Sequence, residues 1–188
     1  MPKARITREM IVDAAFAVAR TAGAASVSAR TVAAALGCST QPVMYLFATV
    51  EELKRAVYDR ADRFHTEYLM NTDTQSDPLL GMGLNYVRFA IEEPHLFRFL
   101  FQSGYAVENS LLEMVDAQAL APVLSVMQGA MGLDGRRTKE VFVTLALFTH
   151  GYASIIANNH LEFDRETVAA HMERAYRGAL LAAREDMR

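Results

Sequence analysis

Three side chains that can form hydrogen bonds lie close together between Ser39 and Leu46. Thr40 and Gln41 fall in the first turn of a predicted short helix, and Tyr45 follows one turn later. A glutamine amide can pair with both N6 and N7 of adenine, whereas a threonine can contact a thymine methyl or a phosphate. The hydroxyl of Tyr45 is placed for a phosphate. The chemistry that these residues predict is the recognition of double-stranded DNA.

Two elements must position these side chains. Ser28 can cap a preceding helix, which Gly37 ends because glycine adopts the left-handed conformation without a steric penalty. Ser39 can cap the next helix, and Pro42 is tolerated in its opening turn, where a backbone N–H lacks an intrahelical partner. Helix, glycine turn and short helix form a helix-turn-helix pattern, whose second helix enters a DNA major groove. The alternative is an ordinary packing unit of two small helices.

The flanking residues add candidate phosphate contacts. Arg30 carries the only full charge within residues 24–49, which favours a phosphate contact over an unpartnered surface arginine. Thr49 and Glu52 form a capping box at the start of a long helix that runs to about Met70. The candidate DNA-binding residues are Ser28, Arg30, Ser39, Thr40, Gln41, Tyr45 and Thr49.

The N-terminal residues offer one further contact. Lys3, Arg5 and Arg8 form a basic arm that can reach phosphates or an adjacent minor groove, and a solvated, frayed terminus is the alternative. Cys38 at the turn is expected to pack as a small hydrophobic residue.

The same stretch resembles the DNA-binding domain of the TetR family of bacterial regulators. The resemblance rests on Ala33-x-x-x-Gly37-Cys-Ser39, Phe47 and Glu51-Glu52-Leu53, and it covers about Thr7 to Phe64. Two positions depart from the family pattern. Met44 stands where a tyrosine is usual, and Val50 stands where a lysine is frequent; both positions commonly hold phosphate-binding groups.

Composition and charge bound the class of protein. The 188 residues are 52% hydrophobic and 22% charged, which is typical of a globular protein and leaves apolar surface for a homo-oligomer. The net charge is −3, but residues 1–63 carry nine Lys/Arg against six Asp/Glu, whereas residues 64–188 carry ten against sixteen. The positive part thus coincides with the predicted DNA-binding domain. One cysteine, a polar N-terminus and no apolar run approaching membrane-spanning length predict a cytoplasmic protein.

No constellation of residues predicts an enzyme. The five histidines form no i, i+4 pair, and a single cysteine provides no zinc framework, so neither a metal nor a cofactor is expected. Gly81-Met-Gly83 lacks the third glycine of a nucleotide-binding loop and the strand before it. Nucleophile-elbow, Walker and paired-carboxylate patterns are missing too.

The rest of the chain predicts helices alone, so that the fold class is all-α with about nine helices. A polar loop at Asn71–Pro78 separates the long helix from the next one, and the predicted domains are 1–64 and 65–188. Four later helices are expected over residues 79–91, 94–101, 137–158 and 164–184. A further helix is expected from Asn109, with a kink or a break at Pro122, and a loop is expected over residues 129–135.

The second domain resembles the C-terminal regulatory domain of TetR-like proteins. The segment YVRFAIEEPHLFRFLF and Thr149-His150-Gly151-Tyr152 carry this resemblance, which implies a helical ligand-sensing and dimerisation domain. Aromatic and methionine side chains at helical spacing can line an apolar pocket, or they can simply fill a core. The candidate pocket residues are Tyr86, Phe89, Phe97, Phe101, Met114, Met127 and Phe148, with His150 and Tyr152 as polar groups.

The last two predicted helices carry apolar stripes that can form a homodimer interface. These stripes are Leu145, Phe148, Tyr152 and Ile156 on one helix and Val168, Met172, Ala175 and Ala179 on the other. Two such pairs would make a four-helix interface, and a shared intramolecular core is the alternative.

The sequence therefore predicts a homodimeric repressor that binds a palindromic operator and is released by a small apolar or aromatic effector. A helical small-molecule-binding protein with a degenerate DNA-binding region is the alternative.

Overall fold

The computed structural model describes residues 6–72, 77–105, 115, 120–159 and 161–185. Within these ranges the regular structure consists of nine α-helices and one 3-10 helix, which confirms the all-α prediction. The chain forms two compact units, Met1–His65 with Glu93–Ala106, and Thr66–Glu92 with Val107–Arg188. We call them unit 1 and unit 2. The domain boundary after residue 64 stays a prediction; in the structure, residues 93–106 belong with the N-terminal helices.

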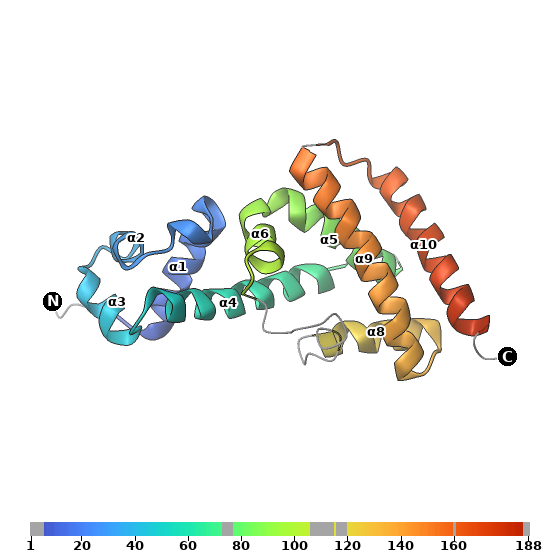
Figure 1. The fold of residues 1–188 in the computed structure, drawn as a ribbon, viewed down its shortest axis with the longest axis horizontal. Coiled ribbons are helices and arrows are strands. Elements are labelled where there is room, and N and C mark those ends of the chain that lie inside the picture. Colours follow the sequence, from blue (N-terminus) through green and yellow to red (C-terminus); the bar gives the residue numbers. More distant parts are fainter. Residues whose placement is uncertain (1–5, 73–76, 106–114, 116–119, 160, 186–188) are drawn as a thin grey trace. The chain divides into compact units, whose positions relative to one another are not determined.

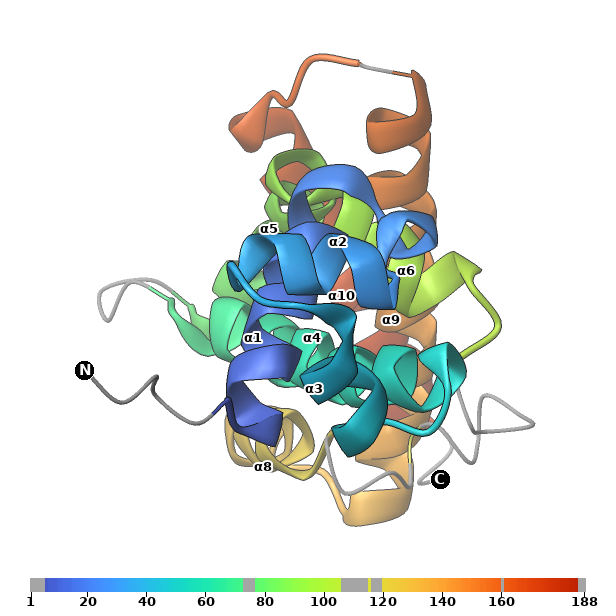
Figure 2. The same cartoon turned by 90° about the vertical axis from the view of Figure 1, so that its left-hand side faces the viewer.

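Unit 1 is built from short helices around α1. It contains α1 (Arg8–Ala22), η1 (Ala24–Ser26), α2 (Ala29–Ala35), α3 (Thr40–Leu46), the part of α4 (Val50–Met70) up to His65, and α6 (Pro94–Gln102). In Figures 1 and 2, α2 packs against both α1 and α3. The α6 helix packs against α1 and η1 and buries Leu96, Phe97, Phe99 and Leu100.

Local signals set the helix boundaries of unit 1 as the sequence predicts. The Thr7 hydroxyl accepts a hydrogen bond from the Met10 N–H at 3.2 Å and caps α1. Gly37 has a φ of 64°, the left-handed conformation that ends α2. Ser39 occupies the N-cap of α3 but makes no side-chain capping bond. In the Thr49–Glu52 capping box, Glu52 returns its bond to the Ala48 N–H at 3.0 Å, not to the Thr49 N–H.

Unit 2 is organised around α9 (Gly135–Asn159). This helix packs against α5 (Pro78–Glu92), α8 (Ala121–Met131) and α10 (Arg165–Glu185), as Figure 1 shows. The buried cluster between them consists of Met82, Val123, Met127, Met131, Leu133, Val141 and Ala183.

One of the two predictions about α8 is wrong. A kink or a break was expected at Pro122, and Pro122 lies in the first turn of α8, where it begins a helix. The loop expected from Gly129 is wrong, because α8 continues to Met131 and ends at Gly132, whose φ is 64°. The helix expected from Asn109 falls mostly outside the described residues.

The α9 helix overturns one further prediction. It is 25 residues long and is apolar enough, by length and composition, to span a membrane, although no such run was expected from the sequence. Only 17% of its most apolar 18-residue window is buried. Because α9 packs along one side against α5, α8 and α10, its apolar residues divide into a buried face and an exposed face.

Candidate functional site

The α3 helix separates a buried face from an exposed polar face. Val43 is buried, as is Phe47 at the helix end, and both hold α3 on unit 1. Thr40 and Gln41 are exposed, and the Tyr45 side chain is 85% exposed. A tyrosine ring in water contributes nothing to the core, so the predicted contact residues of α3 lie on a face free to meet a ligand. Met44, where the family usually has tyrosine, is also exposed on α3.

The other predicted DNA-contact residues lie at helix starts. Arg30 is exposed on α2. The Ser28 hydroxyl accepts from the Thr31 N–H at 3.1 Å, while the Thr31 hydroxyl accepts from the Ser28 N–H at 3.0 Å. The Thr49 hydroxyl similarly accepts from the Glu52 N–H at 3.0 Å. Ser28 and Thr49 therefore already cap helices, which orients α2 and α4.

Arg8 does not belong to a flexible basic arm. It is the first residue of α1, and its guanidinium donates to the Leu46 carbonyl at 2.8 Å and to the Glu52 carboxylate at 3.1 Å. The same guanidinium lies 3.9 Å from the centroid of the Phe47 ring. Arg8 thus joins the start of α1 to the end of α3 and the start of α4. Lys3 and Arg5 lie outside the described residues.

The first turns of α4 carry contacts that the sequence did not predict. Tyr105 donates its hydroxyl proton to Glu51 and accepts a hydrogen bond from Arg55 at its backbone carbonyl. The bond from Tyr105 lowers the pKa of Glu51, while burial and the same bond raise the pKa of Tyr105 to about 12. The Tyr105 ring also stacks on Tyr58, with 6.4 Å between centroids. No local sequence signal marks these pairs, because about fifty residues separate the partners.

The predicted ligand-pocket residues are divided between the two units. Phe97 and Phe101 belong to unit 1, where their ring centroids lie 5.2 Å apart and Phe101 contacts His65 edge to face. In unit 2, Phe89 is fully buried against Tyr68, whereas Phe148 is 37% exposed. Met127 belongs to the buried cluster of unit 2. Met114 lies outside the described residues.

The predicted polar groups of the pocket are hydrogen-bonded between helices. The Tyr86 hydroxyl on α5 lies 2.9 Å from His150 Nδ1 on α9, and Ser154 Oγ lies 3.3 Å from His150 Nε2. Tyr152 on α9 similarly lies 3.1 Å from His171 Nδ1 on α10. Burial raises the pKa of Tyr86 and lowers the pKa of His150, so both groups are neutral at pH 7.

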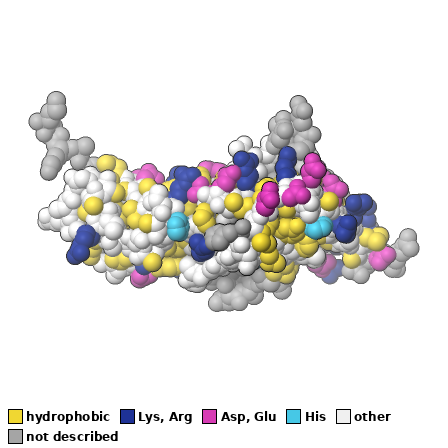
Figure 3. All heavy atoms as spheres, turned by 90° about the horizontal axis from the view of Figure 1, so that it is seen from above, with side chains coloured by type: hydrophobic (Ala, Val, Ile, Leu, Met, Phe, Trp, Pro, Cys, Tyr) yellow, Lys and Arg dark blue, Asp and Glu magenta, His cyan; other side chains and the backbone are white. Residues whose placement is uncertain are grey.

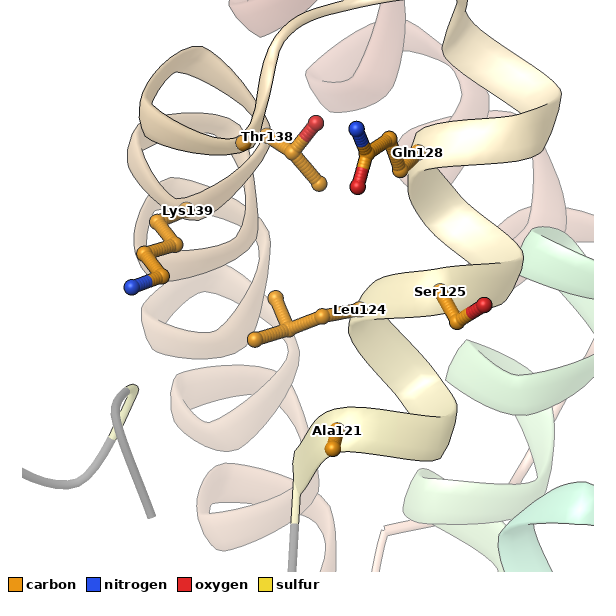
Figure 4. Close-up of a pocket in the computed structure, with 7 residues that line it drawn as sticks. Ala121, Leu124, Ser125, Gln128, Thr138 and Lys139 are labelled. Atoms are coloured by element: carbon orange, nitrogen blue, oxygen red, sulfur yellow. The ribbon is translucent and has the colours of Figure 1, made fainter. Parts of the chain in front are cut away.

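Unit 2 contains two cavities among its described residues. One, of about 290 Å³, lies between α8 and the start of α9, where Gln128 and Thr138 point toward one another beside Leu124 (Figure 4). The other, of about 400 Å³, is lined by the end of α4, by α5 and by the link to α10. Of the predicted pocket residues that the structure describes, none lines either cavity. The lining side chains are mostly polar, so apolar periodicity in the sequence does not reveal them.

Charge does not concentrate on the face shown in Figure 3, where acidic and basic side chains are interspersed. Among the residues that the structure describes, no group of three or more His, Cys, Asp or Glu could hold a metal ion.

Comparisons with known proteins relate this geometry to one family. The model for the family described as "Tetracyclin repressor-like, C-terminal domain" matches residues 79–178. No curated protein matches the chain.

Solved structures share the fold. A TetR-family member from Streptomyces coelicolor A3 has a TM-score of 0.58 at 21% identity, covering 89% of this chain and 96% of that one. The multidrug binding protein EbrR complexed with ethidium has a TM-score of 0.55 at 19% identity, covering 93% of this chain and 99% of that one.

Proposed function

Because the chain belongs to the family of tetracycline-repressor-like (TetR) proteins, we propose that it is a DNA-binding transcriptional regulator that responds to a small molecule. The observation that carries the proposal is the exposed face of α3, on which Thr40, Gln41 and Tyr45 stand outward while Val43 is buried. In this role α3 enters the major groove, Gln41 pairs with a base edge, and Arg30 on α2 contacts a phosphate.

The regulator acts as a homodimer on a palindromic operator. Support comes from the outer face of α9, where Leu147, Phe148 and Ile155 are exposed at helical spacing, and from Leu181 on α10. A Cβ added at Gly151, in the middle of this face, would meet nothing within 4 Å, so another helix could approach closely there. Of the stripes predicted from the sequence, Ile156, Val168 and Met172 are instead buried within the chain.

The effector is a small apolar or aromatic molecule, and its binding releases the operator. EbrR is described as a multidrug binding protein and has been solved with ethidium and with imidazole, which supports a small-molecule effector for a chain of the same fold. An effector can act only through its difference in affinity between the states that fit and do not fit DNA. The proposed location is the bacterial cytoplasm, and the proposed effect on transcription is repression.

A mobility-shift titration on the upstream DNA of the gene tests the proposal, at two salt concentrations and with random DNA as competitor. Gln41→Ala should lose the preference for operator over random DNA, because a bidentate base contact contributes about 1–3 kcal/mol of discrimination. Arg30→Ala should weaken binding to all sequences and reduce the salt dependence. Equal losses on both DNAs for both variants would refute these roles.

Met44 and Val50 favour one second candidate, a small-molecule-binding protein with a degenerate DNA-binding region. Binding to no sequence in a genome-wide DNA selection, combined with retained small-molecule binding, would support this candidate.

A further inference from the structure

The larger cavity of unit 2 has a lining that differs from that of an apolar drug pocket. Its volume is about 400 Å³, within the range of sites for small molecules. Four short pieces of chain form its wall: the residues after α4, the middle of α5, the α9–α10 link and the first residue of α10. The lining consists of Asn71, Thr72, Gly81, Leu84, Asn85, Arg88, Phe163 and Arg165.

The two cations of this lining are available to an anion. Arg88 uses its Nε to donate to Glu92 at 2.7 Å, which leaves the two Nη groups of its guanidinium for another acceptor. Arg165 forms no ion pair with any residue in the described part of the chain. The adjacent carboxylate, Asp164, instead accepts from the Glu166 N–H at 3.1 Å and from the Thr167 hydroxyl at 2.5 Å.

A hydrogen-bond donor, the Asn85 side chain, also lies beside the C-terminal end of α4. The C-terminal carbonyls of α4 would repel a negative charge, since they form the negative end of its dipole. The Asn85 amide nitrogen donates toward three of these carbonyls, at 3.3 Å to Tyr68, 3.4 Å to Leu69 and 3.1 Å to Asn71. The Asn85 amide thus places its partial positive charge beside these carbonyls, which weakens their repulsion of an anion.

The lining also includes two apolar side chains. Leu84, which is almost fully buried in unit 2, and Phe163 in the α9–α10 link both line the cavity. A hydrated inorganic anion gains nothing from such a surface, whereas an organic acid buries its hydrocarbon part there. Guanidinium groups bind carboxylates in a planar, two-pronged geometry.

From these contacts we infer that the cavity between α4, α5 and the α9–α10 link binds a small carboxylic acid with an apolar body. Arg88 and Arg165 hold its carboxylate, and Leu84 and Phe163 contact its hydrocarbon part. None of the predicted effector-pocket residues that the structure describes lines this cavity.

Calorimetric titration of the full chain tests the inference, with acetate, benzoate, 1-naphthoate, benzyl alcohol and inorganic phosphate as probes. Affinity should rise from acetate to 1-naphthoate, and benzyl alcohol should bind far more weakly than benzoate. Arg165→Gln and Arg88→Gln should each weaken benzoate binding about tenfold or more, because each removes a charged hydrogen bond. Arg177→Gln, an exposed arginine elsewhere on α10, should leave binding unchanged and serves as the matched control.

Three results would overturn the site: no binding of any carboxylate, equal benzoate affinity in Arg165→Gln and Arg177→Gln, or phosphate binding as tightly as 1-naphthoate. The titration uses no DNA, so its result is independent of whether the chain binds an operator.

Discussion

At the scale of single residues, Arg8 was expected in a basic N-terminal arm but instead connects α1 to the end of α3 and the start of α4. Its guanidinium contacts a backbone carbonyl, a carboxylate and an aromatic ring, all of which lie at the end of α3 or the start of α4. The ion pair with Glu52 is about half exposed and contributes little alone. The carbonyl bond and the ring contact add to it, so Arg8 helps to fix the position of α3.

Arg8→Gln should therefore lower the thermal midpoint by a few degrees, since losing about 1–2 kcal/mol shifts the midpoint by about 2–4 °C per kcal/mol in a chain of this size. Arg30→Gln removes the same charge from an exposed position and should leave the midpoint unchanged. Differential scanning calorimetry on both variants makes the comparison; equal midpoints for the two would show that Arg8 has no positioning role.

His65 makes the stability of the folded chain depend on pH. Burial lowers its pKa to about 4, whereas the unfolded chain has the ordinary value of 6.5. The unfolded state therefore takes up the proton first, and stability that is complete above pH 6.5 is lost as the pH falls toward 4. Burial lowers the pKa of His150 as well, so this residue acts with the same sign.

Urea unfolding at pH 7.5, 5.5 and 4.5 should give a falling free energy of unfolding, by at most about 1.4 kcal/mol per pH unit from His65. His65→Leu should flatten this dependence, even where it changes stability at pH 7.5. A slope that is identical in His65→Leu and the natural chain would exclude His65 as its source.

The sequence predicts the residues that cap helices, but it does not predict the long-range partners of Arg8 and Tyr105. Thr7, Ser28 and Gly37 act on a backbone two to four residues away, so short-range patterns reveal them. Arg8 and Tyr105 meet partners about forty to fifty residues away, and only the folded chain brings them together.

At the scale of elements, α6 belongs to the N-terminal unit because of one ion pair and one apolar face. Glu93, the N-cap of α6, is buried and accepts from Arg20 Nε on α1 at 2.8 Å and 3.0 Å. The Arg20 guanidinium lies 5.1 Å from the centroid of the Phe64 ring on α4. Three helices thus meet at one bidentate contact.

Glu93→Gln should destabilise the chain by about 1–3 kcal/mol, because it weakens a charged hydrogen bond at a buried acceptor. Glu140→Gln, in an exposed i, i+4 pair with Arg136, should cost less than about 0.5 kcal/mol and is the matched control. Urea midpoints measure both. Equal costs would mean that the α1–α6 contact contributes no more than a surface pair.

The sequence predicted most helix limits within one or two residues, but it placed the end of α8 before Gly129, whereas the helix continues to Met131. Pro122 and Gly129 are both helix breakers in isolation. In the structure Pro122 lies in an opening turn, where proline costs nothing, and Met127 and Met131 hold the helix past Gly129 through burial. Tertiary packing thus overrides the propensity of a single glycine. The cavities of unit 2 could not be predicted for a related reason: they form between mostly polar side chains, which apolar periodicity in the sequence does not reveal.

At the scale of the whole molecule, the outer face of α9 is the surface of the proposed dimer. Ile155 is 59% exposed and Leu147 is 52% exposed, on a helix whose opposite side is buried in unit 2. Apolar residues repeated along one exposed face mark an interaction surface and not random exposure. In a symmetric dimer this face would meet its own copy.

Ile155→Glu should convert a dimer into a monomer, because it would bury two like charges in the shared interface. Gln102→Glu introduces the same charge at an exposed polar position of α6 in unit 1 and should leave the dimer intact. Sedimentation velocity distinguishes the two states. A natural chain that is already monomeric at tens of micromolar, or an Ile155→Glu chain that stays dimeric, would contradict this assignment.

The scarcity of charge within residues 24–49 has a consequence for the proposed regulator in the cell. Arg30 is the only full charge within residues 24–49, and weak, sequence-independent attachment to DNA grows with the number of phosphates that a protein neutralises. A regulator with so few charged residues in this segment would bind only weakly to chromosomal DNA outside its operator. Few copies per cell would then keep a single operator occupied, and the regulated gene would respond to small changes in how much regulator is made.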